Sequence, residues 1–512
     1  MNNRTDPTEI YKEYQDGISY QEQIELSENV RKNENMYNDR QWEGVKAPDL
    51  EKPVFNFLKP VVNYYVAQIV SDDIAANLET MGDDGADPVP KIIGREIERL
   101  LETTRAAFKN RQLVRNMAVD GDMCLYCYWD PEKQYGEGLL GDIETQIIKN
   151  TDVFFGNTLS ADVQSQPYLI IRQRRLLSSA RREARENGED PDLIVEDSDP
   201  EEGVRAEKYV TVLLKFYREG GAVHFTKVTR SGVIKRPTRL GYDRYPIAYA
   251  SWEPVHDSCH GVSPLTGKRA NQIFVNKLYA MAMEYTKNQS FPKLLYDGTK
   301  IKGWSNRVGE AIAVSGDPRT ALFASFQAAG MNADVMNMVE KTVTQTKEMM
   351  GAYDAALGNV KPDNTSAIVA VQKAASMPLD LQRMNFYQFM EDVVRIWIDM
   401  MAAHYGPREV VIEGAQGERA FWIFDFSTLS PYRYKLNIEI GASSYWSELM
   451  QVQTLDNLMA QKIIPDAVTY LENIPDGYIK GKGKIIERIK QQQLEGGGNN
   501  GLSGVPGGGL PV

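Results

Sequence analysis

The sequence is poor in the residues on which enzymes and disulfide-bonded proteins most often depend. Its 512 residues include three cysteines and four histidines. A small, odd number of cysteines does not build a disulfide framework, so the sequence predicts a reducing compartment. Four histidines also leave few candidates for acid–base catalysis near neutral pH. The composition therefore gives little support to a catalytic role.

Long apolar runs are missing as well. The longest apolar stretches are far shorter than the roughly 18 residues that a membrane span needs. Residues 1–20 are polar and acidic, without the apolar core of a signal peptide. We therefore expect no membrane partner, and a protein that is cytosolic or assembled in the cytosol.

The common catalytic fingerprints are absent too. There is no nucleophile elbow, no HExxH helix and no nucleotide-binding glycine motif. Residues 261–269 (GVSPLTGKR) come near a phosphate-binding loop, but the glycines are too far apart and Arg269 stands where Ser or Thr would hold magnesium. Ser263 as a cap and Pro264 in the first turn predict a helix start instead. We expect no catalytic residue and no cofactor.

One metal site stays open as an alternative. A zinc enzyme could draw its ligands from Cys124, Cys127, Cys259 and His260. The segment around Cys124 and Cys127 alternates like a strand, which would point the two thiols to opposite faces. We therefore favour buried thiols that pack as small apolar side chains, and no metal.

The residues that are abundant predict a large, acidic protein. The chain is 42% hydrophobic and 25% charged, which is enough for a sizeable core in two to four compact units. Its net charge of -12 argues against broad electrostatic wrapping of nucleic acid, which needs Lys and Arg to displace counterions. Acidic walls would instead suit a polyanion that passes nearby without binding.

Periodicity in the first half predicts an α+β fold. Helical patterns cover residues 7–40, with an interruption at Gly17, then residues 53–78 and 91–119. Alternating patterns predict strands over residues 124–129, 142–149, 168–175, 208–217 and 222–228. Gly220 and Gly221 predict a hairpin turn between the last two strands, and the acidic residues 186–202 predict a solvated loop.

The second half predicts long helices around a small insertion. Helices are expected over residues 263–288, 332–357 and 366–404, the last kinked at Pro378. Residues 291–328 are mixed, with short strands at 293–296 and 311–314. Further strands are expected at 409–413, 420–426 and 433–440, and helices at 444–461, 465–472 and 482–493. The Gly-rich tail predicts disorder.

The helix over residues 332–357 carries a stripe with the spacing of a helix-packing seam. Its members are Val335, Val339, Thr342, Thr346, Met349 and Tyr353. Two of them are threonines, so the seam is too polar for a strong monomer core, and we expect it to pack between neighbouring subunits.

Several local sequences, in this order, resemble those of the portal proteins of tailed double-stranded-DNA bacteriophages. They are MYNDRQW at 36–42, the segment 53–68, NMAVDG at 116–121, DVFF at 152–155, GVSPL at 261–265, and residues 358–359, 364–367 and 378–382. Together they extend across residues 30–440.

The resemblance implies a dodecameric ring at one capsid vertex, through which a separate terminase motor packages DNA. It implies these parts: a wing (1–262), two stem helices (263–290 and 331–356) enclosing a clip (291–330), a tunnel loop (357–366), a long helix with a wing return (367–442), a helical crown (443–495) and a disordered tail (496–512). The implied partners are the terminase large subunit, the head–tail adaptor, the major capsid or scaffolding protein, and the double-stranded DNA in the bore.

Two groups of residues carry the expected contacts. Asn359, Lys361, Asp363 and Asn364 would line the channel, because the loop between two helices is nearly neutral and Lys361 is its only basic group. Lys300, Lys302, Trp304 and Arg307 would form the partner-binding clip. Another virion structural or connector protein remains the alternative within the same class.

Overall fold

The structure is a computed structural model in two compact units, residues 1–71 with 76–438, and residues 72–75 with 439–512. It describes the whole chain except residues 1–5, 47–49, 71–73, 81–88, 137, 198–207, 291–292, 304–312, 321, 327–333, 353–376, 414–418, 430–433, 441–444, 462, 465–466, 475–481, 483–484, 487 and 491–512. Helices and strands are mixed, as the α+β prediction expected.

The N-terminal helices are α1 (Pro7–Gln23), α2 (Leu26–Tyr37), α3 (Leu58–Ile69), α4 (Val89–Thr103) and α5 (Ala106–Asp120). Asp6 caps α1 by accepting a hydrogen bond from the Thr8 amide at 3.0 Å. The single helices expected over 7–40 and 91–119 are each two helices, separated where Glu25 and Arg105 adopt positive φ. The interruption predicted at Gly17 is wrong, because Gly17 lies inside α1.

The helix predicted over 53–78 is too long at both ends. Within it, α3 begins at Leu58 and ends at Ile69, and strand β1 (Ile74–Thr80) follows. Strand β1 pairs with β14 (Tyr434–Ile440), which is distant in the sequence. Local periodicity could not predict this pairing because the partner lies at the other end of the chain.

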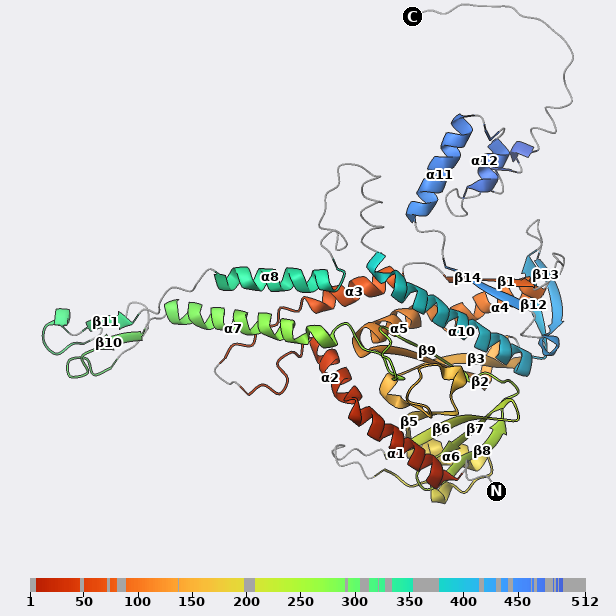
Figure 1. Ribbon diagram of the computed structural model, residues 1–512, viewed down its shortest axis with the longest axis horizontal. Helices are drawn as coiled ribbons and strands as arrows, with labels where there is room; N and C mark the ends of the chain where they lie inside the picture. The colour runs from red at the N-terminus through yellow and green to blue at the C-terminus, as the bar shows by residue number, and fades with distance from the viewer. Residues whose placement is uncertain are drawn as a thin grey trace, which may run out of the picture. The chain divides into compact units, whose positions relative to one another are not determined.

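Two antiparallel sheets form the middle of the first unit (Figure 1). One has the order β3-β2-β9, with β2 (Asp122–Gly136), β3 (Leu139–Ile148) and β9 (Ile247–Ser251). The other runs in chain order through β4 (Val153–Phe155), β5 (Tyr168–Leu176), β6 (Tyr209–Glu219), β7 (Ala222–Val228) and β8 (Val233–Arg239). Strands β2, β3, β5, β6 and β7 match the alternating patterns, whereas β4, β8 and β9 were not predicted. Gly220 and Gly221 take positive φ in the predicted turn.

Both faces of the five-stranded sheet are buried, with alternate residues on each. On one face Leu169, Ile171 and Val212 join the main core, which also holds Ala180 and Ala184 of α6 (Leu177–Glu186). On the other face Ile170, Leu213 and Val228 pack against Ile10 and Tyr14 of α1. The period of two along each strand produces this division.

The second half of the first unit contains the long helices. They are α7 (Arg269–Ser290), α8 (Asp334–Met349) and α10 (Asp380–His404), with strands β10 (Lys293–Tyr296) and β11 (Leu322–Phe326) paired between α7 and α8. Pro378 lies in a 3-10 turn, Met377–Leu379, immediately before α10, where its ring is compatible with a first turn. Residues 366–376 of the predicted helix lie outside the described residues, so the kink at Pro378 stays a prediction.

The remaining elements complete the two units. Strands β12 (Pro407–Glu413) and β13 (Arg419–Asp425) form a hairpin in the first unit. The second unit contains α11 (Tyr445–Ala460) and α12 (Ala467–Asn473), which match two of the predicted C-terminal helices. The predicted strand 311–314, the helix 482–493 and the tail 496–512 lie partly or wholly outside the described residues.

Candidate channel and docking surfaces

Helices α7 and α8 lie side by side and run in opposite directions (Figure 1). The Nδ2 of Asn271, near the start of α7, donates to the Thr346 hydroxyl, near the end of α8, at 2.8 Å. Lys268 Nζ lies 3.7 Å from the Met349 sulfur at the same end. The paired strands β10 and β11 connect the opposite ends of the two helices.

Some residues of the predicted subunit seam are buried within the single chain, and others are accessible at its surface. Val339 and Thr346 are buried within the single chain, so their side chains are not available to a neighbouring subunit. Thr346 is buried because its hydroxyl bonds Asn271 and the Thr342 carbonyl. Val335 and Thr342 are half-buried and Met349 is exposed, while Tyr353 lies outside the described residues. An intersubunit role therefore stays a prediction only for the accessible members.

Large apolar side chains are exposed on both helices. Met281 is 63% exposed on α7, and Met338 and Met349 are 54% and 69% exposed on α8. Met377 and Met384, at the start of the next long helix, are also exposed. Methionine packs adaptably against irregular surfaces, so this group is suited to contacts with another chain.

Polar side chains of α7 hold the helix against the segment before α3. Gln272 Oε1 accepts from the Phe57 amide at 3.1 Å, and its Nε2 donates to the Phe55 carbonyl at 2.7 Å. Asn276 Oδ1 accepts from the Phe55 amide at 3.1 Å, and its Nδ2 donates to Gln41. Two helix side chains thus satisfy an extended backbone that has no strand partner.

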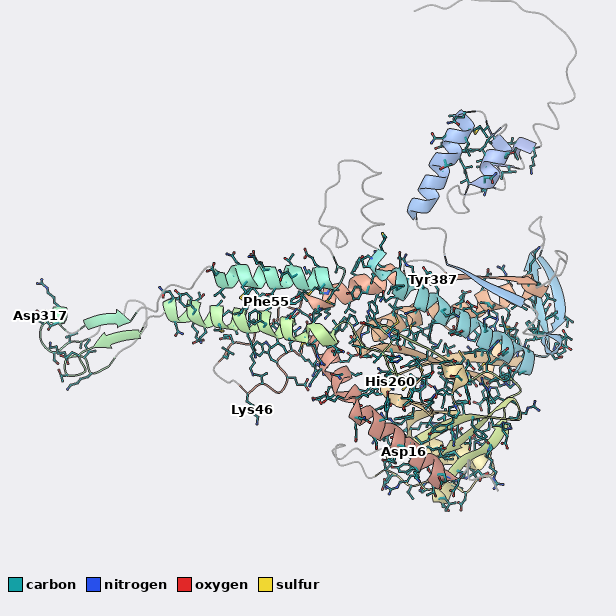
Figure 2. All side chains as sticks on the ribbon, viewed as in Figure 1. Asp16, Lys46, Phe55, His260, Asp317 and Tyr387 are labelled. Carbon is teal, nitrogen blue, oxygen red and sulfur yellow. The ribbon has the colours of Figure 1, made fainter. Side chains whose placement is uncertain are left out.

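An aromatic contact completes this attachment. The Phe55 ring, labelled in Figure 2, stacks on Tyr279 of α7 with centroids 3.9 Å apart.

Gln272 and Asn276 were not predicted as important residues. Their only signal in the sequence is an amide pair four positions apart on one helix face.

A buried polar cluster connects the first sheet to the segment that leads into α7. Asp122, at the start of β2, accepts from the Gly261 amide at 2.8 Å and from Asn150 Nδ2 at 3.1 Å. His260 Nδ1 lies 3.1 Å from the Asp122 carboxylate and 3.0 Å from the Tyr249 hydroxyl. Burial alone would lower the pKa of His260, but hydrogen bonding and charge interactions with Asp122 and Cys259 together outweigh burial and raise the pKa to about 9.

The helix start predicted at Ser263 follows directly from this cluster. Ser263 Oγ accepts from the Leu265 amide at 3.1 Å and donates to the Ala118 carbonyl at 2.7 Å. A 3-10 turn, Thr266–Lys268, comes next, and α7 begins at Arg269. Residues 261–269 therefore serve as a helix start that is attached to α5, as the capping pattern predicted.

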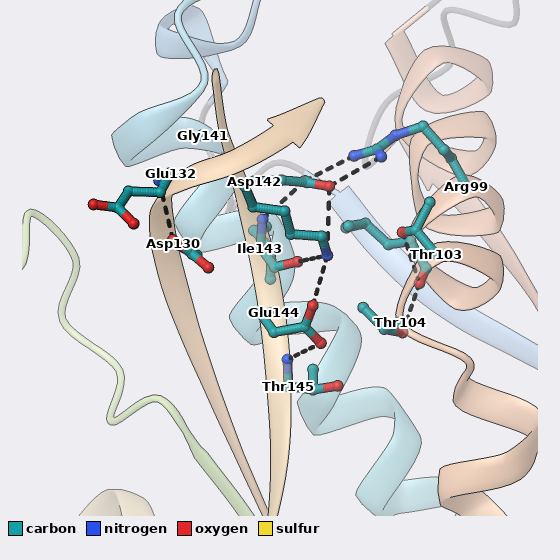
Figure 3. Close-up of polar contacts among 12 residues, drawn as sticks. Arg99, Thr103, Thr104, Asp130, Glu132, Gly141, Asp142, Ile143, Glu144 and Thr145 are labelled. Atoms are coloured by element: carbon teal, nitrogen blue, oxygen red, sulfur yellow. Dashed lines mark hydrogen bonds and ion pairs between the residues drawn. The ribbon is translucent and has the colours of Figure 1, made fainter. Parts of the chain in front are cut away.

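A second buried network holds the C-terminal end of α10 against the first sheet. Arg99 of α4 binds the Asp142 carboxylate with two guanidinium nitrogens, at 3.1 and 2.8 Å (Figure 3). The Tyr405 hydroxyl donates to the same carboxylate at 2.8 Å. Burial would raise the pKa of Asp142, but its hydrogen bonds to Arg99 lower it. The ring of Tyr405 also lies 3.8 Å from the Arg408 guanidinium.

The described part of the predicted clip is small and polar. Lys300 donates to the Thr320 hydroxyl at 2.9 Å and lies 3.4 Å from the Asp297 carboxylate. Lys302 is exposed. Trp304 and Arg307 lie outside the described residues, as do the four predicted channel residues Asn359, Lys361, Asp363 and Asn364. The roles of these contact residues therefore stay predictions.

The four candidate zinc ligands do not assemble. Cys124 belongs to the main core, whereas Cys127 faces the other side of β2, beside Trp397 of α10. All three cysteines are buried and free, and burial raises the pKa of the Cys127 thiol to about 12. Among the described residues there is no group of three His, Cys, Asp or Glu side chains that could hold a metal ion.

No helix in the described part of the chain is both long and apolar enough to cross a membrane. A search of curated proteins found no match to this sequence. A family model does match: that of the phage P22-like portal protein, over residues 173–496. This match covers more than half of the chain and includes the paired helices α7 and α8, the strands between them and α10. The chain therefore belongs to the family of phage P22-like portal proteins.

Proposed function

We propose that this chain is a subunit of a ring-shaped channel at one capsid vertex, through which phage DNA is packaged, retained and ejected. The observation that carries the proposal is the family match across a stem-like pair of antiparallel helices with a small paired-strand segment at their end. The proposed role is structural, not catalytic. The protein would assemble in the host cytoplasm and remain in the virion.

The ring is proposed to contain twelve copies joined by heterologous contacts, in which one surface of a subunit meets a different surface of the next. The exposed methionines of α7 and α8 support such contacts, because they present apolar surface that the single chain leaves open. Major capsid or scaffolding protein would surround the ring. Electron microscopy of the purified protein tests this proposal: closed rings support it, and particles without rotational symmetry contradict it.

The loop over residues 357–366 is proposed to touch passing DNA, with Lys361 as its main contact beside Asn359, Asp363 and Asn364. In a twelve-membered ring one lysine becomes a circle of charges that faces the phosphate backbone. Each contact would be weak and screened by salt, which suits sliding. Phage carrying Lys361→Glu should assemble rings but package or retain less DNA, and normal full-length genomes in that phage would contradict the contact.

The clip is proposed to bind the terminase large subunit and later the head–tail adaptor. Lys300 and Lys302 supply charge, and Trp304 and Arg307 are residue types that often anchor interfaces. Replacing Trp304 and Arg307 by alanine should leave rings intact and abolish terminase binding in a pull-down. Unchanged binding would contradict this assignment, and the loss of rings would show a structural role instead.

A further inference from the structure

We propose that a polar hollow beside α1 is a docking site for an acidic peptide segment of a partner protein. The hollow has a volume of about 860 Å³ and lies between α1, strands β5 and β6, and residues 195–197. Its size falls within the range of about 300–1,000 Å³ in which protein pockets bind ligands. The proposal does not depend on ring formation, because every residue of the hollow belongs to one chain.

Four cations line the hollow: Lys149, Arg172, Arg174 and Arg230. Arg172 pairs with the Asp152 carboxylate at 2.6 Å, and its Nη1 lies 3.4 Å from the Tyr14 hydroxyl. Arg230 is exposed and lies 5.5 Å from the centroid of the Tyr11 ring. Within the described part of the chain, Lys149 and Arg230 make no ion pair.

The carboxylates of the hollow already have partners. Asp152 is paired with Arg172. Glu196 pairs with Lys208 at 2.8 Å. Asp197 accepts from the amide and the hydroxyl of Thr211, at 2.7 and 2.6 Å. Asp152 and Glu196 are thus already paired, whereas Lys149 and Arg230 make no ion pair in the described part of the chain, and a carboxylate from another chain would form those pairs.

A peptide fits this hollow better than nucleic acid does. A continuous phosphate backbone would face Asp152, Glu196 and Asp197 as well as the cations, and those contacts would be repulsive. The chain's net charge of -12 weakens nucleic-acid binding further. A peptide can place separate carboxylates against Lys149 and Arg230 and turn apolar or hydrogen-bonding groups toward Tyr11 and Tyr14.

The test is a titration of the full-length protein with a fluorescein-labelled peptide of about twelve residues in which Glu alternates with Gly, at low salt so that charge contacts are not screened. Fluorescence anisotropy should show saturable binding. The double variant Lys149→Glu with Arg230→Glu should weaken that binding at least about tenfold. The control Arg182→Glu, an exposed cation on α6 outside the hollow, should leave it unchanged.

Three results would overturn the proposal. The first is no saturable binding of the peptide. The second is equal weakening by the Arg182→Glu control, which would show non-specific charge attraction. The third is a duplex oligonucleotide of equal charge that binds more tightly and is weakened by the same double variant, which would make the hollow a nucleic-acid site. If the charge-reversed protein does not fold, Lys149→Ala with Arg230→Ala replaces it, with the same expected direction.

Discussion

At the scale of single residues, Gly17 shows how tertiary contact reverses a local preference. Glycine in a helix predicts an interruption, yet α1 continues through Gly17 because Phe154 packs directly against it. An alanine Cβ there would lie 2.7 Å from Phe154 Cδ1, closer than van der Waals contact allows. Because Gly17 has no side chain, α1 can pack closely against Phe154 of the sheet.

Gly17→Ala should therefore destabilise the protein by about 1–3 kcal/mol, although alanine usually stabilises an exposed helix by roughly 1 kcal/mol. Denaturant unfolding measures the difference. Gly267→Ala is the matched control, because no atom lies within 4 Å of its added Cβ, and we expect a change within about 0.5 kcal/mol. A Gly17→Ala protein that is more stable than the parent would contradict the close contact.

Asp122 is a buried carboxylate between the first sheet and the segment that leads into α7, and it bonds Gly261, Asn150 and His260. Asp122→Ala leaves these buried partners unsatisfied, and we expect a loss of about 3–5 kcal/mol in the free energy of unfolding. Asp16→Ala, at an exposed aspartate on α1 (Figure 2), should change it by less than about 0.5 kcal/mol. Similar losses in the two variants would refute the special role of Asp122.

The same junction makes stability depend on pH. The folded-state pKa of His260, about 9, lies above the ordinary histidine pKa of 6.5, so the folded protein binds the proton more tightly than the unfolded chain. Its stabilising contribution is fully present below about pH 6.5 and is lost as the pH rises through 9. Denaturant unfolding at a series of pH values should show a decline of about 3 kcal/mol that His260→Gln removes. An equal decline in both proteins would assign it to other groups.

At the scale of elements, α7 is held by side chains that form hydrogen bonds with the backbone of residues 55–57. Gln272→Leu leaves the Phe57 amide and the Phe55 carbonyl without their bonds, which we expect to cost about 2–4 kcal/mol. Gln289→Leu, at an exposed glutamine on the same helix, is the control and should be nearly neutral. Hydrogen exchange of the two Phe amides adds a local readout, and unchanged protection of Phe57 would contradict the attachment.

At the scale of the whole molecule, we expect the exposed methionines of α7 and α8 to form contacts between subunits. One chain has a mass of 57.8 kDa, and native mass measurement should find closed multiples of it, most often twelve. Met281→Glu with Met338→Glu should abolish these rings but leave a folded chain, because both side chains are exposed. Leu140→Glu, equally exposed on β3, should leave rings intact. A parent protein that stays monomeric at all concentrations would overturn the ring itself.

The sequence by itself determined the kind and the order of many of the elements. The alternation of residues 168–175 and 208–228 predicted strands, and Gly220-Gly221 predicted their hairpin, because period and turn chemistry are local properties. Ser263 and Pro264 likewise predicted the start of the helical segment that leads into α7. The local pattern also predicted that Cys124 and Cys127 lie on opposite faces of the strand, because residues an odd number of positions apart in a strand point to opposite sides.

Only the tertiary structure decided what those elements touch. Residues 74–80 form a strand because they pair with β14, and Thr346 is bonded by Asn271, so both outcomes depend on partners far along the chain. The Asp122–His260 and Gln272–Phe55 contacts join residues more than a hundred positions apart. A pattern within one segment carries no information about which distant segment will satisfy its buried polar groups, and those groups determine how Asp122 and α7 are bonded to the rest of the chain.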